Sequence, residues 1–265
     1  MIPLDGAALV GVLGDTEGNQ PWVFDRISKF AEAGITTVLH LGDFHLGVGD
    51  PRVSKGRLIR TDRWLQKHEQ TWLITPGNHE NWDRLNAKRP GPHGLLWFGE
   101  RVAFIPRGHR WAWHSVDFVS LGGAPSVNRE RLTPGRSWWA DEQITNDDVE
   151  RVIGAGHADV MLAHDAPDPL TPSVQRIVDS NPHRLDAETL EYAGVGRDRL
   201  TRAFASVRPR LLLHGHHHVH DRSHVQLAQA NFETEIVALA ADDMPRNAAV
   251  LHLGGGPERL RVEII

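Results

Sequence analysis

The chain has 265 residues, enough to bury a sizeable hydrophobic core, and 40% of them are hydrophobic and 24% charged, as is typical of a globular protein. It contains no cysteine, which excludes disulfides, thiolate zinc sites, iron–sulfur clusters and a cysteine nucleophile. The net charge is −5 and no long run of lysine and arginine occurs, which argues against a surface that binds duplex nucleic acid through many phosphate contacts.

The N-terminal residues, Met1–Leu13, do not have the features of a targeting segment. They lack a basic region and carry Asp5 inside a short apolar run, so no signal peptide is expected. No stretch of the sequence approaches the roughly 20 consecutive apolar residues that a membrane span needs. We therefore expect a cytoplasmic protein without a membrane partner.

The first half of the chain is predicted to alternate between strands and helices. Continuous apolar runs predict buried strands, and apolar residues at helical spacing predict helices. The expected elements are a strand over Ala7–Leu13, a helix over Pro21–Ala33, a strand over Thr36–Leu41, a helix over Asp62–Glu69, a strand over Thr71–Thr75, short β-like pieces around Val102–Ile105 and Arg110–Trp113, and a strand over Val116–Leu121.

The second half continues the alternation and ends in strands. Asn146 is the expected N-cap of a helix that ends at Ile153. The remaining expected elements are a strand over Asp159–Ala163, a helix that ends near Val207, and strands over Arg210–Leu213, Glu235–Leu239, Ala248–Leu253 and Leu260–Ile264. This order predicts an α/β fold in one domain over residues 1–265. About ten strands are too many for one flat sheet, so the sheet should curl or split into two.

Polar side chains of metal-binding types follow five of the predicted strands. In open α/β sheets, ligands bind beyond the carboxyl ends of the strands, so these side chains converge if the strands are neighbours. Carboxylates, an amide oxygen and imidazoles are too many ligands for one tetrahedral ion and suit two ions roughly 3.5–4 Å apart, with at least one bridging carboxylate. The residues are Asp15, Glu17, Asp43, Asn78, His79, His164, His216 and His218.

The motifs at these strand ends resemble the calcineurin-like metallophosphoesterase superfamily. Its pattern is D-x-H, G-D-x-x, G-N-H-[ED], a lone histidine after a strand, and G-H-x-H. The chain has, in the same order, Gly14-Asp15-Thr16-Glu17, Gly42-Asp43, Gly77-Asn78-His79-Glu80, His164 and Gly215-His216-His217-His218. The resemblance covers nearly the whole chain. It implies a four-layer α-β-β-α sandwich of two mixed sheets flanked by helices, and a phosphoesterase activity.

The resemblance also implies roles for individual residues. Two divalent cations would activate a water, and the resulting hydroxide would attack phosphorus in line. His79 would donate a proton to the phosphoryl or leaving-group oxygen, and Arg129 is a candidate for binding the phosphoryl group. The implied ligands are Asp15, His218 and possibly Glu17 for the first ion, Asp43 as the bridge, and Asn78, His164 and His216 for the second ion.

Two departures from the pattern narrow the function. Glu17 stands where D-x-H has histidine, and because glutamate is a harder, anionic ligand we expect Mn²⁺, with Zn²⁺, Fe or Mg²⁺ as alternatives. After Asp43 the chain has Phe44-His45-Leu46-Gly47, without the aspartate and arginine of the G-D-x-V-D-R-G motif of protein phosphatases. This argues against a Ser/Thr protein phosphatase and favours small-molecule or nucleotide phosphoesters. His45 itself is expected to be a loop residue.

The leading hypothesis is thus a dinuclear metal-dependent phosphoesterase that cleaves phosphodiesters, which are preferred, or phosphomonoesters. One alternative is a metal-poor, catalytically weak relative that serves as a binding or scaffold module, in which the presence of Glu17 has led to loss of the first ion. The retained proton donor, His79, argues against that alternative. Another alternative is a nuclease of the same superfamily. The negative net charge argues against a nuclease, although nucleic acid stays open as a partner. The oligomeric state stays open.

Overall fold

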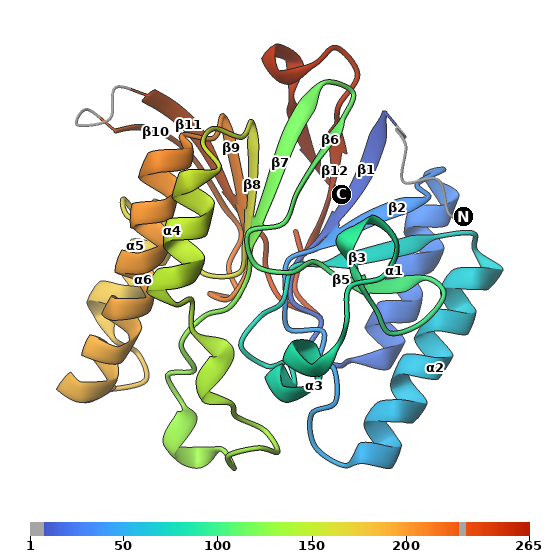
Figure 1. Ribbon diagram of the computed structural model, residues 1–265, viewed down its shortest axis with the longest axis horizontal. Coiled ribbons are helices and arrows are strands. Elements are labelled where there is room, and N and C mark those ends of the chain that lie inside the picture. The colour runs from blue at the N-terminus through green and yellow to red at the C-terminus, as the bar shows by residue number, and fades with distance from the viewer. Residues whose placement is uncertain (1–7, 228–231) are drawn as a thin grey trace.

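The computed structural model describes residues 8–227 and 232–265. Within these residues the chain forms two mixed β-sheets that pack face to face, with helices on their outer sides (Figure 1). The four-layer α-β-β-α sandwich implied by the resemblance is therefore confirmed. Ala7, the first residue of the first expected strand, lies outside the described residues.

The first sheet has seven strands in the order β13-β12-β1-β2-β3-β5-β4. Its central strands β1, β2, β3 and β5 run parallel, so their carboxyl ends lie at one edge of the sheet. The outer strands β12, β13 and β4 are antiparallel to their neighbours. The bounds are β1 Leu9–Leu13, β2 Thr37–His40, β3 Thr71–Ile74, β4 Leu96–Trp97, β5 Val102–Phe104, β12 Ala248–His252 and β13 Arg261–Ile264.

The second sheet has six strands in the order β10-β11-β9-β8-β7-β6. Strands β7, β8, β9 and β11 are parallel, and the edge strands β6 and β10 are antiparallel to their neighbours. The bounds are β6 Arg110–Trp113, β7 Val116–Leu121, β8 Val160–Ala163, β9 Leu211–His214, β10 Asp221–Leu227 and β11 Phe232–Ala238.

Helices α1 and α2 cover the first sheet, and α4 and α6 cover the second (Figure 1). None of the helices among the described residues is long and apolar enough to cross a membrane. The bounds are α1 Gln20–Glu32, α2 Pro51–Lys67, α3 Trp82–Ala87, α4 Asn146–Gly154, α5 Pro172–Ser180 and α6 Ala187–Val207, with short 3-10 turns at Pro92–Gly94, Arg129–Arg131, Ala140–Glu142 and Pro257–Arg259.

The central strands are mostly apolar because both of their faces are buried. In β2, Val38 faces the helical layer and Leu39 faces the other sheet, and neither side chain is exposed. Successive side chains of a strand point to opposite faces, so a sheet buried on both sides requires a continuous apolar run. Helix α1 needs only one apolar stripe, which Val23, Ile27 and Phe30 provide.

Several sequence-based expectations differ from the structure. Helix α2 begins at Pro51 and not at Asp62, because the Asp50 side chain caps it and proline fits the first helical position. Strand β10 was not expected at all. Its residues are mostly polar and it pairs only with β11 at the edge of the sheet, where one face meets solvent. Helix α5, in the Pro-bearing segment after β8, was also missed.

The N-cap of α4 is Thr145 and not Asn146. The Thr145 hydroxyl accepts a hydrogen bond from the backbone N–H of Asp148, and the Asp148 carboxylate accepts one from the backbone N–H of Thr145. This reciprocal pair is a capping box, and it satisfies two backbone donors at once. Asn146 is already the first helical residue, and its side chain accepts a bond from Arg202 at the surface.

We predict that Thr145→Ala lowers the free energy of unfolding by about 1 kcal/mol, as is usual for loss of a capping hydroxyl. Asn146→Ala is the matched control and should change it by no more than roughly 0.5 kcal/mol, because only an exposed contact is lost. Urea unfolding of both variants checks this. A larger loss in Asn146→Ala than in Thr145→Ala would restore the original assignment of the cap.

Candidate metal centre

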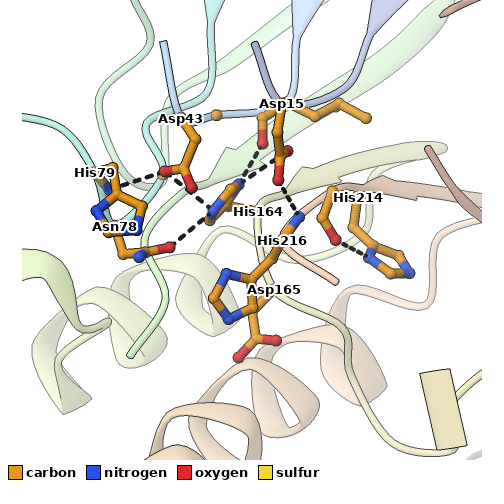
Figure 2. A network of polar contacts seen from close by, with 12 residues as sticks. Asp15, Asp43, Asn78, His79, His164, Asp165, His214 and His216 are labelled. Atoms are coloured by element: carbon orange, nitrogen blue, oxygen red, sulfur yellow. Dashed lines mark hydrogen bonds and ion pairs between the residues drawn. The ribbon is translucent and has the colours of Figure 1, made fainter. Parts of the chain in front are cut away.

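Loops from both sheets meet at the carboxyl edge of the parallel strands. Asp15 follows β1 and Asp43 follows β2 in the first sheet, whereas His164 follows β8 and His216 follows β9 in the second. The backbone N–H of His216 donates to Asp15 Oδ2 over 2.9 Å, so the contact crosses directly from one sheet to the other. Figure 2 shows the His164 ring in the middle of this group, with Asp15, Asp43 and Asn78 around it.

Three carboxylates and one imidazole form the first group of potential metal ligands. Asp15, Glu17, Asp43 and His218 each offer one donor atom, and these atoms all lie within 4.8 Å of one another. His218 Nε2 lies 3.3 Å from Asp15 Oδ2 and 3.2 Å from Glu17 Oε1. Glu17, which stands at the histidine position of the D-x-H motif, therefore lies within the first donor group.

A second group of donors lies beside the first and shares Asp43 with it. The donor atoms of Asp43, His164 and His216 also fall within 4.8 Å of one another. His164 Nε2 is 3.3 Å from Asp43 Oδ1 and 3.0 Å from Asn78 Oδ1, so the amide oxygen of Asn78 faces the same space. Asp43 is thus the carboxylate that belongs to both groups, and it would be the shared ligand if each group held a cation.

The close approach of these loops depends on glycine. A Cβ atom on Gly77 would overlap the carboxylate of Asp43, and one on Gly215 would overlap the carboxylate of Asp15. Nearby residues also adopt left-handed backbone conformations that are rare outside glycine, with φ of 56° at Asp43 and 66° at His216. Such conformations cost energy and are found mainly where function requires them.

The carboxylates at the centre have lost their contact with water. Asp15 is 0% exposed and Asp43 is 1% exposed, and Asp15 Oδ1 has no hydrogen-bond partner among the described residues. Burial raises the pKa of Asp15, although the nearby His164 and His218 oppose this shift. Buried charges of this kind are normally paired or coordinate metals.

The imidazoles show how strongly the carboxylates attract positive charge. Burial lowers the pKa of His164, but the charges of Asp43 and Asp15 outweigh burial and hold it well above the usual range. Hydrogen bonds to Asp15 and Glu17 raise the pKa of His218 to about 10. For His216 burial prevails and lowers the pKa to about 3, which leaves its imidazole neutral and ready to act as a ligand.

This donor set fits divalent cations. A ligand set of carboxylate oxygens, an amide oxygen and imidazole nitrogens suits Mn²⁺, Fe and Zn²⁺. Bound cations would replace the protons that the imidazoles otherwise hold. Asp15, Glu17, Asp43 and His218 would hold one ion, and Asp43, Asn78, His164 and His216 the other.

His79 lies at the same edge of the sheets, but it contacts Asp43 through its backbone and not through its side chain. Its backbone N–H donates to Asp43 Oδ1 over 2.8 Å, while its side chain is partly exposed. Its ring lies 5.4 Å, between centroids, from the ring of His45. His45 belongs to a loop, as expected, but its Nε2 is 2.8 Å from Glu17 Oε2, so it also contacts the site.

Several buried residues behind the site were missed by the sequence analysis. Asn78 Nδ2 donates to Ser126 Oγ over 3.0 Å, and Ser126 in turn donates through its hydroxyl and its backbone N–H to Glu142. Tyr192 donates its hydroxyl to the same carboxylate over 2.9 Å. This network fixes which end of the Asn78 amide faces His164 and the second donor group. The only hint in the sequence is that Ser126 follows a strand, β7, like the ligands themselves.

Glu80 and Asp165 are two further buried carboxylates beside the site. Glu80 accepts from the backbone N–H groups of Gly77 and Phe44, each over 2.6 Å, and so ties the loop after β3 to the loop after β2. Burial raises its pKa to about 7. Asp165 pairs with His217 over 3.2 Å. Each carboxylate directly follows a motif histidine in the sequence, and that position was the available signal.

Arg129 lies on the Tyr192 side of the network. Its guanidinium carbon is 4.0 Å from the centre of the Tyr192 ring, and Nη2 donates to Glu188 over 3.1 Å. Nη1 is buried and has no hydrogen-bond partner among the described residues. The structure therefore places Arg129 beyond Asn78 and Ser126, connected to them through Tyr192 and Glu142.

With the fold and the donor groups defined, comparison with known proteins gives the family. The family model described as calcineurin-like phosphoesterase matches residues 8–220, which span all the ligand-type residues of the site. The chain belongs to this family. The curated proteins compared with it include no match.

Solved structures share the fold at low sequence identity. A dimetal phosphatase from Danio rerio superposes with a TM-score of 0.57 at 10% identity, covering 98% of this chain and 99% of that chain. The protein TT1561 of Thermus thermophilus superposes with a TM-score of 0.56 at 12% identity, covering 97% of this chain and 98% of that chain. At such identities these likenesses establish the fold alone.

We predict that Ser126→Ala weakens Mn²⁺ binding at the Asn78, His164 and His216 position by about tenfold, as is typical when a residue that orients a metal ligand is removed. The Asn78 amide loses its acceptor and is free to rotate. Calorimetric titration with Mn²⁺ measures this, and Ser28→Ala is the control, because the Ser28 hydroxyl bonds only within α1. Equal affinities in Ser126→Ala and the natural protein would contradict an orienting role.

Proposed function

We propose that the protein is a dinuclear metal-dependent phosphoesterase that hydrolyses small phosphoesters. The observation that supports this most directly is the shared position of Asp43, whose carboxylate belongs to both donor groups. Membership of the calcineurin-like phosphoesterase family supports a phosphoesterase activity, and the number of ions and the mechanism are proposals beyond it.

The two cations, when bound, would act as Lewis acids and lower the pKa of a water that attacks phosphorus in line. The chain's own residues prepare the reaction around them. Backbone N–H groups of His79 and His216 hold the carboxylates of Asp43 and Asp15 in place. The partly exposed imidazole of His79 is proposed to bind the phosphoryl or leaving-group oxygen and to donate the proton that the leaving group needs.

Mn²⁺ is the proposed metal. In the first group three of the four donors are carboxylates, namely Asp15, Glu17 and Asp43, and the fourth is His218. Hard oxygen ligands favour Mn²⁺ or Mg²⁺ relative to softer ions, whereas a site richer in imidazole suits Zn²⁺ or Fe. Glu17 thus bears on the choice of metal as well as on the strength of binding.

The proposed substrates are small, with phosphodiesters such as cyclic nucleotides preferred to monoesters. The loop after Asp43 lacks the phosphate-binding arginine of the protein phosphatases. Nucleic acid is a less favoured partner, and a nuclease activity or a scaffold role with weak metal binding are the alternatives. A cytoplasmic location and a single domain over residues 1–265 also stay predictions.

We expect hydrolysis of bis-p-nitrophenyl phosphate, and more weakly of p-nitrophenyl phosphate, with Mn²⁺ giving faster turnover than Zn²⁺ or Mg²⁺. His79→Ala should lower kcat by about 10²- to 10⁴-fold, because a positioned proton donor is lost, while Mn²⁺ still binds. Its backbone N–H still supports Asp43, so loss of metal is not the cause. Asp43→Asn should lose both ions and all turnover.

Turnover assays with each metal, and metal analysis of protein purified without added metal, test these expectations. Absence of turnover with every metal would favour the scaffold alternative. Two tightly held zinc ions would contradict the preference for Mn²⁺.

Arg129 is proposed to bind the substrate through its guanidinium group. Because a hydrogen bond to a charged group contributes about 1.5–3 kcal/mol, Arg129→Ala should raise KM by roughly tenfold or more with a smaller effect on kcat. Arg131→Ala is the matched control, since Arg131 is exposed in the same turn. Steady-state kinetics decide the matter, and unchanged KM and kcat in Arg129→Ala would end the proposal.

A further inference from the structure

The side chain of His45 lies between Glu17 and His79. His45 Nε2 is 2.8 Å from Glu17 Oε2, and the ring centroids of His45 and His79 are 5.4 Å apart with the rings tilted by 49°. The imidazole of His45 is 19% exposed, so most of it is enclosed by the loops of the site. None of the proposed roles above uses this residue.

The two oxygens of Glu17 face different partners. Oε1 is buried and lies 3.2 Å from His218 Nε2, on the side of Asp15 and Asp43 where the first donor group gathers. Oε2 faces the other way and accepts from His45. A carboxylate with one oxygen held by an imidazole N–H cannot turn about its terminal bond without losing that hydrogen bond. The contact therefore fixes the orientation of the Glu17 carboxylate relative to the first donor group.

The backbone of the two loops places Glu17 and His45 close together. Glu17, Asp43 and His45 all adopt left-handed conformations, with φ of 47°, 56° and 65°, which residues other than glycine rarely do. The backbone N–H of Glu17 donates to the carbonyl of Asp43 over 3.0 Å, which joins the two loops. The Glu80 carboxylate accepts from the backbone N–H of His45 over 3.2 Å. These two backbone hydrogen bonds hold the loops that carry Glu17 and His45 next to each other and so favour the contact between their side chains.

We propose that His45 is the positioning residue for Glu17 and that the pair replaces the single histidine of the D-x-H motif as the means of binding the first divalent cation. The imidazole donates to Oε2 and keeps the other oxygen on the side of His218, where Glu17 would serve as a ligand. Partners of this kind, which orient a ligand without touching the metal, commonly set metal affinity. The inference rests on the proposed metal-dependent function and adds a residue to it.

The same geometry allows a different role, in which His45 acts on the His79 ring and not on Glu17. The two roles make opposite predictions when Glu17 is changed. If His45 serves Glu17, its substitution matters only while residue 17 is glutamate. If it serves His79, its substitution has the same effect whatever stands at residue 17.

The experiment is a double-variant cycle on the full chain, with Mn²⁺ affinity measured by calorimetry. The variants are His45→Asn, His45→Gln, Glu17→His, and Glu17→His with His45→Asn. Asparagine tolerates the left-handed backbone but is too short to reach Glu17, whereas the amide nitrogen of glutamine lies as many bonds from Cα as Nε2 of histidine does. We expect His45→Asn to weaken the first site about tenfold or more, and His45→Gln to restore most of the affinity. In the Glu17→His background, His45→Asn should change little.

Two controls separate this effect from misfolding. His93→Asn changes an exposed histidine with a comparable left-handed backbone, φ 59°, and should leave Mn²⁺ binding unchanged. The affinity of the second site, formed by Asn78, His164 and His216, should persist in every variant and report an intact fold.

Unchanged first-site affinity in His45→Asn would overturn the inference, and so would an equal loss in the natural and Glu17→His backgrounds. In either case, normal Mn²⁺ binding and turnover of bis-p-nitrophenyl phosphate by the natural protein would leave the proposed function standing. A natural protein that binds no Mn²⁺ would overturn both.

Discussion

Two buried carboxylates, Asp15 and Asp43, impose the main constraint on the rest of the structure. Charge taken out of water is costly unless hydrogen bonds or opposite charges compensate it. Here backbone N–H groups of His216 and His79 provide part of the compensation, and the imidazoles of His164 and His218 provide more. The partners come from both sheets, so the carboxylates are stable only if the sheets bring their carboxyl ends together.

The apolar layers of the core bring the carboxyl ends of the two sheets together. Each central strand is buried on both faces, against a helix layer on one side and the other sheet on the opposite side. Since the strands that lead into the site are parallel within each sheet, their polar ends collect at one edge and their apolar bodies stay in the core. The packed core thus fixes the positions of the strand ends, and the loops that follow these ends present the ligand-type side chains.

Behind the potential ligands lies a set of residues that touch no cation position but determine how the ligands point. Ser126 and Glu142 orient the amide of Asn78, Glu80 ties together the loops after β2 and β3, and His45 holds one oxygen of Glu17. These contacts are short and largely enclosed, so each ligand is held in one orientation before any cation arrives. Such preorganisation is what sets metal affinity and positions a proton donor.

The sequence by itself determined the layer structure and the chemistry at the strand ends. Apolar runs such as residues 10–13 predict strands buried on both sides, and a ligand-type residue shortly after such a run marks the edge where a site forms. The sequence carries little sign of strand β10, because a mostly polar edge strand lacks an apolar run. The start of α2 was missed although Asp50-Pro51 is a local signal for a helix N-terminus.

Only the tertiary structure decided that His45 contacts Glu17 and which residues lie behind Asn78. Those contacts join positions such as Asn78 and Ser126 or Glu17 and His45, whose separation along the chain follows no period of helix or strand. They depend on left-handed backbone turns that bring two loops side by side, and a sequence pattern records the turn residues but not the side chains that the turns bring into contact.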